Sequence, residues 1–204
     1  MGLLRAPALR LGMLSLATSA ARKVLDALDA FLSAGIPIVV PEPSCLAVFR
    51  DEMPKLLPDD PRASKLASLS RSLSEHLEAI SWVAPIEASN QHVSIHPHCH
   101  QRAVRTTSSD ERILASAGFK VEVLDLGCCG LAGSFGFQKD HDQLSREIAR
   151  DRFLPGIVRS ALDGPVILDG FSCQLQAVEL AKLETTSMAE LLAELLQTKH
   201  CGGQ

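Results

Sequence analysis

The spacing of apolar residues predicts helices that alternate with short strands along the whole chain. Apolar side chains recur at helical intervals in several segments, which are 18–33, 45–57, 60–80, 108–118, 140–162, a helix opening at Cys173, and 187–199. Short apolar runs rich in β-branched residues predict strands at 36–40, 92–96, 119–126 and 166–168. This alternation is typical of an α/β protein with parallel sheets.

Local sequence signals predict where several of these helices begin and end. Asp60 and Pro61 predict the N-cap and the first residue of the helix over 60–80. Gly35 predicts the end of the helix over 18–33. Three pairs have the spacing of a capping box, namely Ser108 with Glu111, Asp140 with Gln143, and Ser187 with Glu190. Pro155 predicts a bend in the helix over 140–162.

Two stretches of the chain repeat one plan. PIVVPEPSC at 37–45 and PVILDGFSC at 165–173 each give a proline, an apolar strand, a turn and then Ser-Cys opening a helix. An internal repeat predicts two similar Rossmann-like halves with short parallel sheets and cysteines at the carboxyl ends of the strands. The polar segment 83–91 places the boundary between a first half at 1–88 and a second half at 89–204.

The composition indicates a globular protein and argues against some classes of binding partner. The 204 residues are 46% hydrophobic and 22% charged, as in soluble globular proteins. The net charge of −4 and the 4% aromatic content argue against nucleic acid as a partner. No apolar run reaches the ~18 residues of a transmembrane segment. We expect a cytoplasmic protein, either free or peripheral to the inner face of the membrane.

The first 23 residues lack acidic side chains and allow two interpretations. Their four basic residues and the apolar run LGMLSLATSA are compatible with a signal or transit peptide. The same residues also fit a loop that leads into an amphipathic helix. Nothing else in the chain has exported character, which favours the second interpretation.

Six cysteines are present, and four of them follow predicted strands of the second half: Cys99, Cys128, Cys129 and Cys173. The carboxyl ends of neighbouring parallel strands meet at one sheet edge, so these thiols can converge despite long gaps in sequence. A long, helix-rich chain with uneven cysteine spacing suits thiolate ligands better than a disulfide framework. Soft thiolates select iron–sulfur clusters, zinc or copper(I).

The loop DLGCCGLAGSFGF at 125–137 carries two of these thiols. Gly127, Gly130 and Gly133 permit positive φ and close backbone approach, which a loop wrapped around a compact cofactor needs. The alternative is a glycine-rich surface turn in which Cys128 and Cys129 are small buried hydrophobic residues.

Cys45 opens a predicted helix, where the helix dipole would favour its thiolate form. Because it echoes Cys173 across the repeat, we expect both to approach a shared centre in a cleft between the halves. The alternative is a buried helix residue without a chemical role. Cys201, in the C-terminal tail, receives no role.

Histidines surround Cys99. Pro97 predicts an extended stretch with His98 and His100 on one side and Cys99 on the other. We interpret these two histidines as donors that support the metal ligands or as a protonatable rim. A zinc site with Cys99, or polar loop residues with no role, are the alternatives.

Four motifs together resemble the cysteine-rich CCG domain family: EPSCLAVFRDE at 42–52, HPHCHQ at 96–101, GCCGLAGSFG at 127–136 and GFSC at 170–173. This family occurs in heterodisulfide reductase, in the iron–sulfur subunit of glycolate oxidase, and at the C-terminus of FAD-linked oxidases acting on D-2-hydroxy acids such as D-lactate or D-2-hydroxyglutarate. The resemblance covers residues 11–196, and the motifs are most similar to those of the FAD-linked oxidases.

The resemblance implies an electron-transfer module of an FAD-linked 2-hydroxy acid dehydrogenase. Cys99, Cys128, Cys129 and Cys173 would bind a [4Fe–4S] cluster, with Cys45 as a further candidate from a degenerate first half. The FAD would reside on a partner flavoprotein with a ferredoxin-like domain, so the module would not be catalytic alone.

The chain departs from the family pattern after Cys173, where Gln174, Leu175 and Gln176 stand in place of a C-x-x-C ending. A four-ligand cluster is therefore the simpler expectation. Two other classes of function stay open: a zinc-stabilised interaction domain, and a metal-free thiol-redox protein using a Cys128–Cys129 disulfide.

Overall fold

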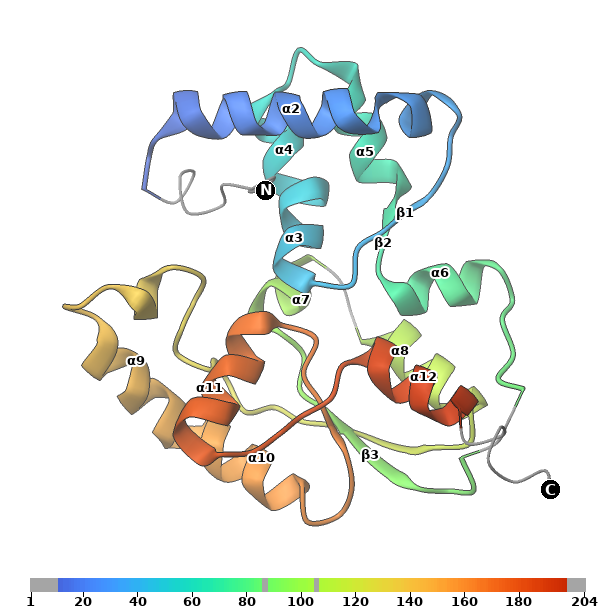
Figure 1. The fold of residues 1–204 in the computed structure, drawn as a ribbon, viewed down its shortest axis with the longest axis vertical. Coiled ribbons are helices and arrows are strands. Elements are labelled where there is room, and N and C mark those ends of the chain that lie inside the picture. Colours follow the sequence, from blue (N-terminus) through green and yellow to red (C-terminus); the bar gives the residue numbers. More distant parts are fainter. Residues whose placement is uncertain (1–10, 86–87, 105–106, 198–204) are drawn as a thin grey trace. The chain divides into compact units, whose positions relative to one another are not determined.

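A computed structural model describes residues 11–85, 88–104 and 107–197, which form parts of two compact units (Figure 1). The first unit ends at Ser72 and the second begins at Leu73. Each combines helices with a small parallel sheet, so the predicted α/β class with parallel sheets is confirmed. Leu73, Leu77, Trp82, Ala84 and Ala88 pack in a core of the second unit.

The first unit is built around one long helix, α2 (Leu14–Ser33), which packs against α5 (Pro61–Leu69). Its remaining elements are β1 (Ile38–Val39), α3 (Pro43–Ala47), a π-helical turn (Val48–Glu52), α4 (Met53–Leu56) and β2 (Ser70–Arg71). Strands β1 and β2 pair in parallel. As predicted, Gly35 with φ of 70° follows the end of α2.

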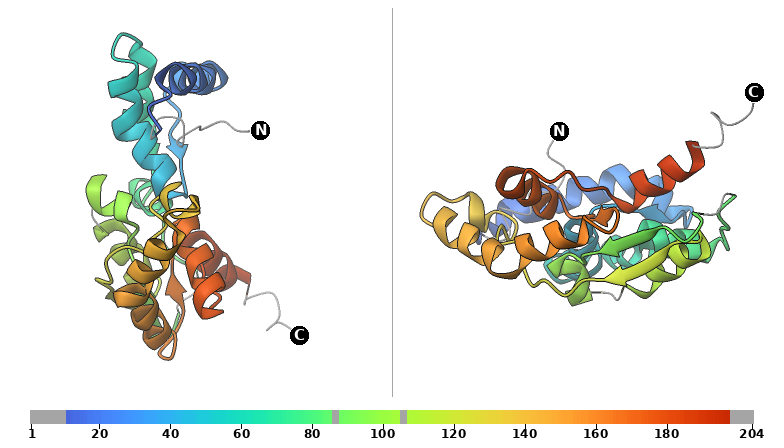
Figure 2. Two further views of the ribbon diagram at one scale, coloured as in Figure 1. Left: turned by 90° about the vertical axis from the view of Figure 1, so that its left-hand side faces the viewer. Right: turned by 90° about the horizontal axis from the view of Figure 1, so that it is seen from below.

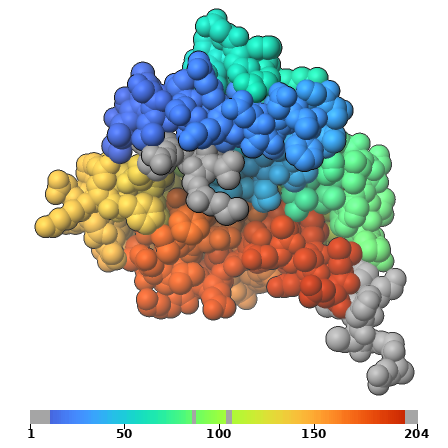
Figure 3. All heavy atoms as spheres, turned by 45° about the horizontal axis from the view of Figure 1, so that its top comes forward, coloured from blue at the N-terminus to red at the C-terminus, as the bar shows by residue number. Residues whose placement is uncertain are grey.

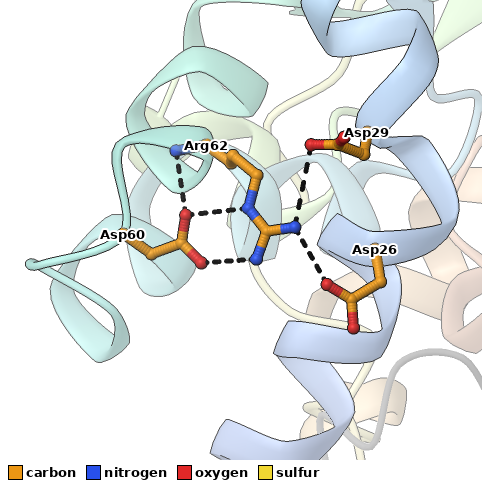
Figure 4. Close-up of polar contacts among 4 residues, drawn as sticks. All are labelled: Asp26, Asp29, Asp60 and Arg62. Atoms are coloured by element: carbon orange, nitrogen blue, oxygen red, sulfur yellow. Dashed lines mark hydrogen bonds and ion pairs between the residues drawn. The ribbon is translucent and has the colours of Figure 1, made fainter.

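Arg62 fixes the start of α5 to α2 (Figure 4). The predicted cap is formed, since the Asp60 carboxylate accepts hydrogen bonds from the Arg62 backbone N–H (3.1 Å) and its guanidinium (2.7 Å). The guanidinium also pairs with Asp26 at 2.9 Å and with Asp29 at 3.7 Å. Helix α2 lies at the surface of the molecule (Figure 3), and its residues Arg22 and Lys23 are exposed.

The single helix predicted over 60–80 is wrong. The chain forms α5, then strand β2, then α6 (Leu73–Ala79). The Ser70 carbonyl accepts two hydrogen bonds from the Arg50 side chain, at 2.8 and 3.1 Å, and Ser70 pairs with Ile38 across the sheet. These tertiary bonds replace the helical hydrogen bonds that the apolar spacing alone favoured.

The second unit has a parallel sheet of three strands in the order β4–β3–β5, seen from two sides in Figure 2. The strands are β3 (His92–Ile95), β4 (Lys120–Val123) and β5 (Val166–Ile167). The helices are α7 (Cys99–Val104), α8 (Ser108–Ser116), α9 (Asp142–Ile148), α10 (Leu154–Ser160), α11 (Phe171–Ala181) and α12 (Met188–Gln197), with a 3-10 turn at Phe135–Phe137 and a π-helical turn at Ala149–Phe153.

Apolar side chains fill both faces of this sheet. Val166 and Leu168 belong to a core formed largely by α10 and α11, whereas Ile167 belongs to a core formed largely by α8 and α12. Because successive strand residues point to opposite faces, helices cover the sheet on both sides. This explains the continuous apolar run of β5.

The helix-end predictions had mixed outcomes. The Ser187–Glu190 capping box is formed, with reciprocal bonds of 2.8 and 3.2 Å. In α8 and α9 the cap positions are instead Thr107 and His141. The helical segment 142–160 consists of α9, the π-helical turn and α10 without a break. The π-helical turn ends at Phe153, two residues before Pro155, the position at which the sequence predicts a bend. Across the described residues, no helix has both the length and the apolar character of a membrane span.

Candidate functional site

Three strands bring four cysteines to one edge of the sheet in the second unit. Ile95, the last residue of β3, is in register with Val123 at the end of β4 and with Ile167 at the end of β5. Each strand is followed within a few residues by at least one cysteine, and the four are Cys99, Cys128, Cys129 and Cys173. The carboxyl edge of this sheet is therefore lined with thiols.

The four thiols contact one another in a row. Each thiol interacts with the next and changes its pKa: Cys99 with Cys128, Cys128 with Cys129, and Cys129 with Cys173. Cys99 and Cys128 are half-buried, whereas Cys129 and Cys173 are each 3% exposed. The row thus runs from a solvent-accessible pair to a pair inside the protein core, and all four cysteines are free thiols.

The hydrogen bonds separate the pKa values within the row. Cys128 has a lowered pKa, because Cys129 and then Cys99 donate S–H hydrogen bonds to its sulfur and the Gly130 backbone N–H donates another at 3.3 Å. The pKa values of Cys99 and Cys129 are raised, first by donating to Cys128 and then by burial or by contact with Cys173. Negative charge in this group therefore concentrates on the sulfur of Cys128.

The loop around Cys128 and Cys129 depends on unusual backbone conformations. Gly127, Gly130, Ala132 and Gly133 all have positive φ. At Gly130 a Cβ atom would lie 2.1 Å from the carbonyl oxygen of Ser145 in α9, so only glycine permits this approach. The predicted need for positive φ is confirmed at these glycines, and their role in binding a cofactor stays a prediction.

His98 packs against the turn that leads to Cys173. His98 is 4% exposed, and a Cβ atom on Gly170 would lie 2.3 Å from its Cδ2 atom. The ring of His100 meets it edge-on, with centroids 5.2 Å apart, and the His100 backbone N–H donates to His98 Nδ1 at 3.2 Å. The Cys99 sulfur lies 4.0 Å from the same nitrogen.

The extended stretch predicted after Pro97 is wrong. Helix α7 begins at Cys99, and the Arg102 N–H already bonds to the His98 carbonyl at 3.0 Å. Proline fixes its own φ at about −65°, a value that a helix also uses, and disfavours the helical region only for the residue before it, so a helix can begin two residues later. Both histidines nevertheless lie beside Cys99.

A third histidine, His96, is buried, and one of its ring nitrogens has no hydrogen-bond partner. His96 is 3% exposed, its Nδ1 has no partner, and its ring packs on Phe153 at 5.2 Å between centroids. Burial, followed by the charge of Arg102, lowers its pKa to about 4. His96 is therefore a neutral side chain at neutral pH.

Several residues that support the thiols gave little signal in the sequence. Gln176, one helical turn after Cys173, is 3% exposed and donates to the Ser145 hydroxyl at 3.2 Å. Arg102 and Arg152 donate to the backbone carbonyls of Leu124 (2.9 Å) and Asp125 (2.7 Å), just before the cysteine loop. The i, i+3 spacing could have identified Gln176, whereas the arginines meet their partners only through the fold.

Cys45 lies in the first unit, in a local structure that matches that of Cys173. Each is the third residue of its helix, and the cap residues Glu42 and Gly170 have nearly equal backbone angles, φ of −88° and −83° and ψ of 119° and 122°. The predicted stabilisation of a Cys45 thiolate is wrong. Burial, together with the charge of Glu42 and its hydrogen bond, raises the pKa of Cys45 to about 12.

The described residues do not form a site for a single metal ion. In 11–85, 88–104 and 107–197, no three Cys, His, Asp or Glu side chains converge as one ion would require. The donor set at the sheet edge is nevertheless chemically suited to iron–sulfur ligation, because it supplies four adjacent thiols, as such clusters use.

Comparison with known proteins places the chain near parts of larger oxidoreductases. It is 28% identical over 173 residues to one subunit of the anaerobic glycerol-3-phosphate dehydrogenase of Escherichia coli, covering 79% of this chain and 41% of that protein. It is 23% identical over 188 residues to the D-2-hydroxyglutarate dehydrogenase of Pseudomonas putida, covering 91% of this chain and 18% of that enzyme. The corresponding enzyme of Escherichia coli is 24% identical over 191 residues, with the same coverage.

These relatives are dehydrogenases or dehydrogenase subunits by name, and the chain spans less than half the length of each. No family model matches the sequence, and no solved structure matches the fold. The similarity therefore links the chain to a segment of such proteins.

Proposed function

We propose that this chain is an iron–sulfur electron-transfer module that works with a flavoprotein. Cys99, Cys128, Cys129 and Cys173 would hold one [4Fe–4S] cluster at the carboxyl edge of the β4–β3–β5 sheet. The observation that carries the proposal is the row of four contacting thiols contributed by three adjacent parallel strands. The similarity to segments of dehydrogenases supports a redox role.

When bound, the cluster would accept and release one electron at a time. The protein's own part is to supply thiolates, to limit solvent and to direct hydrogen bonds at sulfur. The Gly130 N–H already points to the Cys128 sulfur at 3.3 Å. His98, held by Gly170 and His100, lies beside Cys99 and can serve as a further hydrogen-bonding group.

The flavin would be carried by a partner flavoprotein with a ferredoxin-like domain, and the substrate would be a small 2-hydroxy acid. The substrate class rests on the similarity to D-2-hydroxyglutarate dehydrogenases. A separate-chain arrangement has a parallel in the glycerol-3-phosphate dehydrogenase relative, which is itself one subunit of its enzyme. The proposed location is the cytoplasm or the inner face of the membrane.

Iron and acid-labile sulfide assays after anaerobic reconstitution test this proposal. We expect about four irons and four sulfides per chain with broad visible absorption. The Cys128→Ser and Cys129→Ser variants should lose the cluster, because a hydroxyl is a harder and weaker ligand for iron than a thiolate. Cys201→Ser is the control and should retain it. Equal iron content in all three variants would contradict ligation by the cysteine loop.

The Cys45→Ser variant asks whether the first unit contributes a ligand. With four thiols in the second unit, the iron content should fall only if Cys45 also binds the cluster. Zinc bound in place of iron, with no visible absorption, would favour the zinc-stabilised alternative.

A further inference from the structure

The order of the thiol contacts defines how these cysteines would pair on oxidation. The contacts run from Cys99 to Cys128, then to Cys129, then to Cys173. Only one pairing of neighbours uses all four sulfurs, which is Cys99 with Cys128 and Cys129 with Cys173. A Cys128–Cys129 disulfide would leave the two outer thiols without partners.

Backbone geometry also disfavours the Cys128–Cys129 pairing. The described chain has no cis peptide bonds, so the Cα atoms of these neighbours are about 3.8 Å apart. Disulfides usually join Cα atoms that are about 4.4–6.8 Å apart. Cys99 and Cys173 come from other elements, α7 and α11, and are not subject to this restriction.

Burial distinguishes the two pairs. Cys99 and Cys128 are half-buried, so they are the more accessible pair to a small molecule. Cys129 and Cys173 are each 3% exposed and belong to the core that includes Phe153 and Leu168. An oxidant from solvent therefore meets the first pair before the second.

We propose that the metal-free chain is a thiol–disulfide exchange protein whose reactive pair is Cys99–Cys128 and whose oxidant is a low-molecular-weight disulfide. The Cys128 sulfur, which accepts the Gly130 N–H, attacks one sulfur of the disulfide and releases the first thiolate. The Cys99 sulfur then attacks Cys128, releases the second thiolate and closes the protein disulfide. Two protein thiols lose two electrons and two protons, and one small disulfide becomes two small thiols.

This activity uses the sulfurs of the proposed cluster but does not depend on that proposal being correct. If both hold, the two states exclude each other, since a sulfur in a disulfide is no longer a thiolate ligand. Oxidation would then prevent cluster insertion until a dithiol reductant reopens the pair.

Peptide mapping of the metal-free chain tests the pairing. The chain is stripped with a chelator under anaerobic conditions, treated with oxidised glutathione, and quenched with acid and N-ethylmaleimide at successive times. We expect a Cys99–Cys128 cross-linked peptide first and a Cys129–Cys173 peptide later, with Cys45 alkylated throughout. Cys201→Ser should give the same sequence of products.

The Cys99→Ser variant isolates the first step. It should accumulate glutathione on Cys128, because the sulfur that resolves the mixed disulfide is missing. The map of the unmodified chain decides the question even if this variant folds poorly. A Cys128–Cys129 disulfide, a Cys45 disulfide formed first, or unpaired glutathione adducts in the unmodified chain would each overturn the proposal. Iron content is measured on separate reconstituted samples, so failure of the cluster proposal remains distinguishable.

Discussion

Cys128 and Cys45 both follow a short parallel strand, yet their surroundings change their pKa values in opposite directions. Three hydrogen-bond donors surround the Cys128 sulfur and stabilise its thiolate. Cys45 instead is partly buried beside the Glu42 carboxylate, which caps helix α3 by accepting the Cys45 N–H at 2.7 Å. Position at a helix start therefore does not decide thiol chemistry when an acidic cap occupies that end of the helix.

Replacing Glu42 should shift the reactivity of Cys45. Burial is the largest cause of its raised pKa and the carboxylate charge is the next, so Glu42→Gln should lower this pKa while leaving it above 9. We expect alkylation of Cys45 by iodoacetamide to begin at lower pH in the variant, measured by peptide mass spectrometry of the metal-free chain. Asp51→Asn, which removes a nearby acid paired with Lys55, is the control and should not change the profile.

The same pKa shift has a defined sign for stability. A thiol whose pKa is about 12 in the folded chain and 9.0 in the unfolded chain binds its proton more tightly when folded. Its contribution is complete below pH 9 and is lost as the pH rises towards 12. Glu42→Gln should reduce this alkaline loss.

Two glycines of the cysteine loop should respond differently to a methyl group. Gly127 has φ of 75° with open space around a Cβ atom, so Gly127→Ala should cost about 1–2 kcal/mol from backbone strain alone. Gly130→Ala adds a clash at 2.1 Å with the Ser145 carbonyl, and should cost about 1–3 kcal/mol more. Urea unfolding midpoints compare them, and equal costs would show that the loop can move away from α9.

At the scale of elements, helix α7 is held in place by a buried polar network. The Asp110 carboxylate in α8, 2% exposed, accepts the Gln101 amide at 2.7 Å and the Ser74 hydroxyl. Gln101 lies two residues after Cys99, so this network fixes the element that presents that thiol.

Removing the Gln101 amide should destabilise the second unit. In Gln101→Leu the buried Asp110 carboxylate loses one donor, which should cost about 1–3 kcal/mol in the free energy of unfolding. Gln143→Leu is the matched control, because Gln143 pairs with Glu147 on the surface and should change stability by less than about 0.5 kcal/mol. Urea denaturation measures both, and similar midpoints would mean that Gln101 is replaceable.

The elements also show how far the sequence could be interpreted. Apolar periodicity identified strands β3, β4 and β5, because their patterns are local. It missed β2, where the decisive bonds come from Arg50, a residue distant in sequence. It also missed α7, which begins soon after Pro97 and is held by the hydrogen bond between Gln101 and Asp110. This bond forms only in the tertiary structure.

In the candidate site, too, the sequence predicted the features that depend on local patterns and missed those that depend on tertiary contacts. The rule that neighbouring parallel strands end at one edge identified which cysteines lie together, and the register of β3 with both neighbours agrees with it. The sequence could not give the order of contacts within the row, because that order depends on the path of the glycine loop. It also could not anticipate the contact between His98 and Gly170.

At the scale of the whole molecule, the chain matches segments of longer dehydrogenases. In our proposal this chain transfers electrons and a partner protein oxidises the substrate. The described site offers thiols and hydrogen-bond donors. The substrate chemistry of a 2-hydroxy acid dehydrogenase requires a hydride acceptor, which in our proposal is the flavin of a partner.

The purified, cluster-loaded chain should therefore show no dye reduction with D-lactate, glycolate or D-2-hydroxyglutarate. Turnover should appear when the flavoprotein and its ferredoxin-like domain are added, because the cofactor that accepts the hydride is then present. The Cys128→Ser variant, added with the same partners, should not transfer electrons beyond the flavoprotein, whereas Cys201→Ser should behave as the unmodified chain. Turnover by the chain alone would mean that the thiol site itself oxidises the substrate, and it would contradict the proposal that a partner flavoprotein does so.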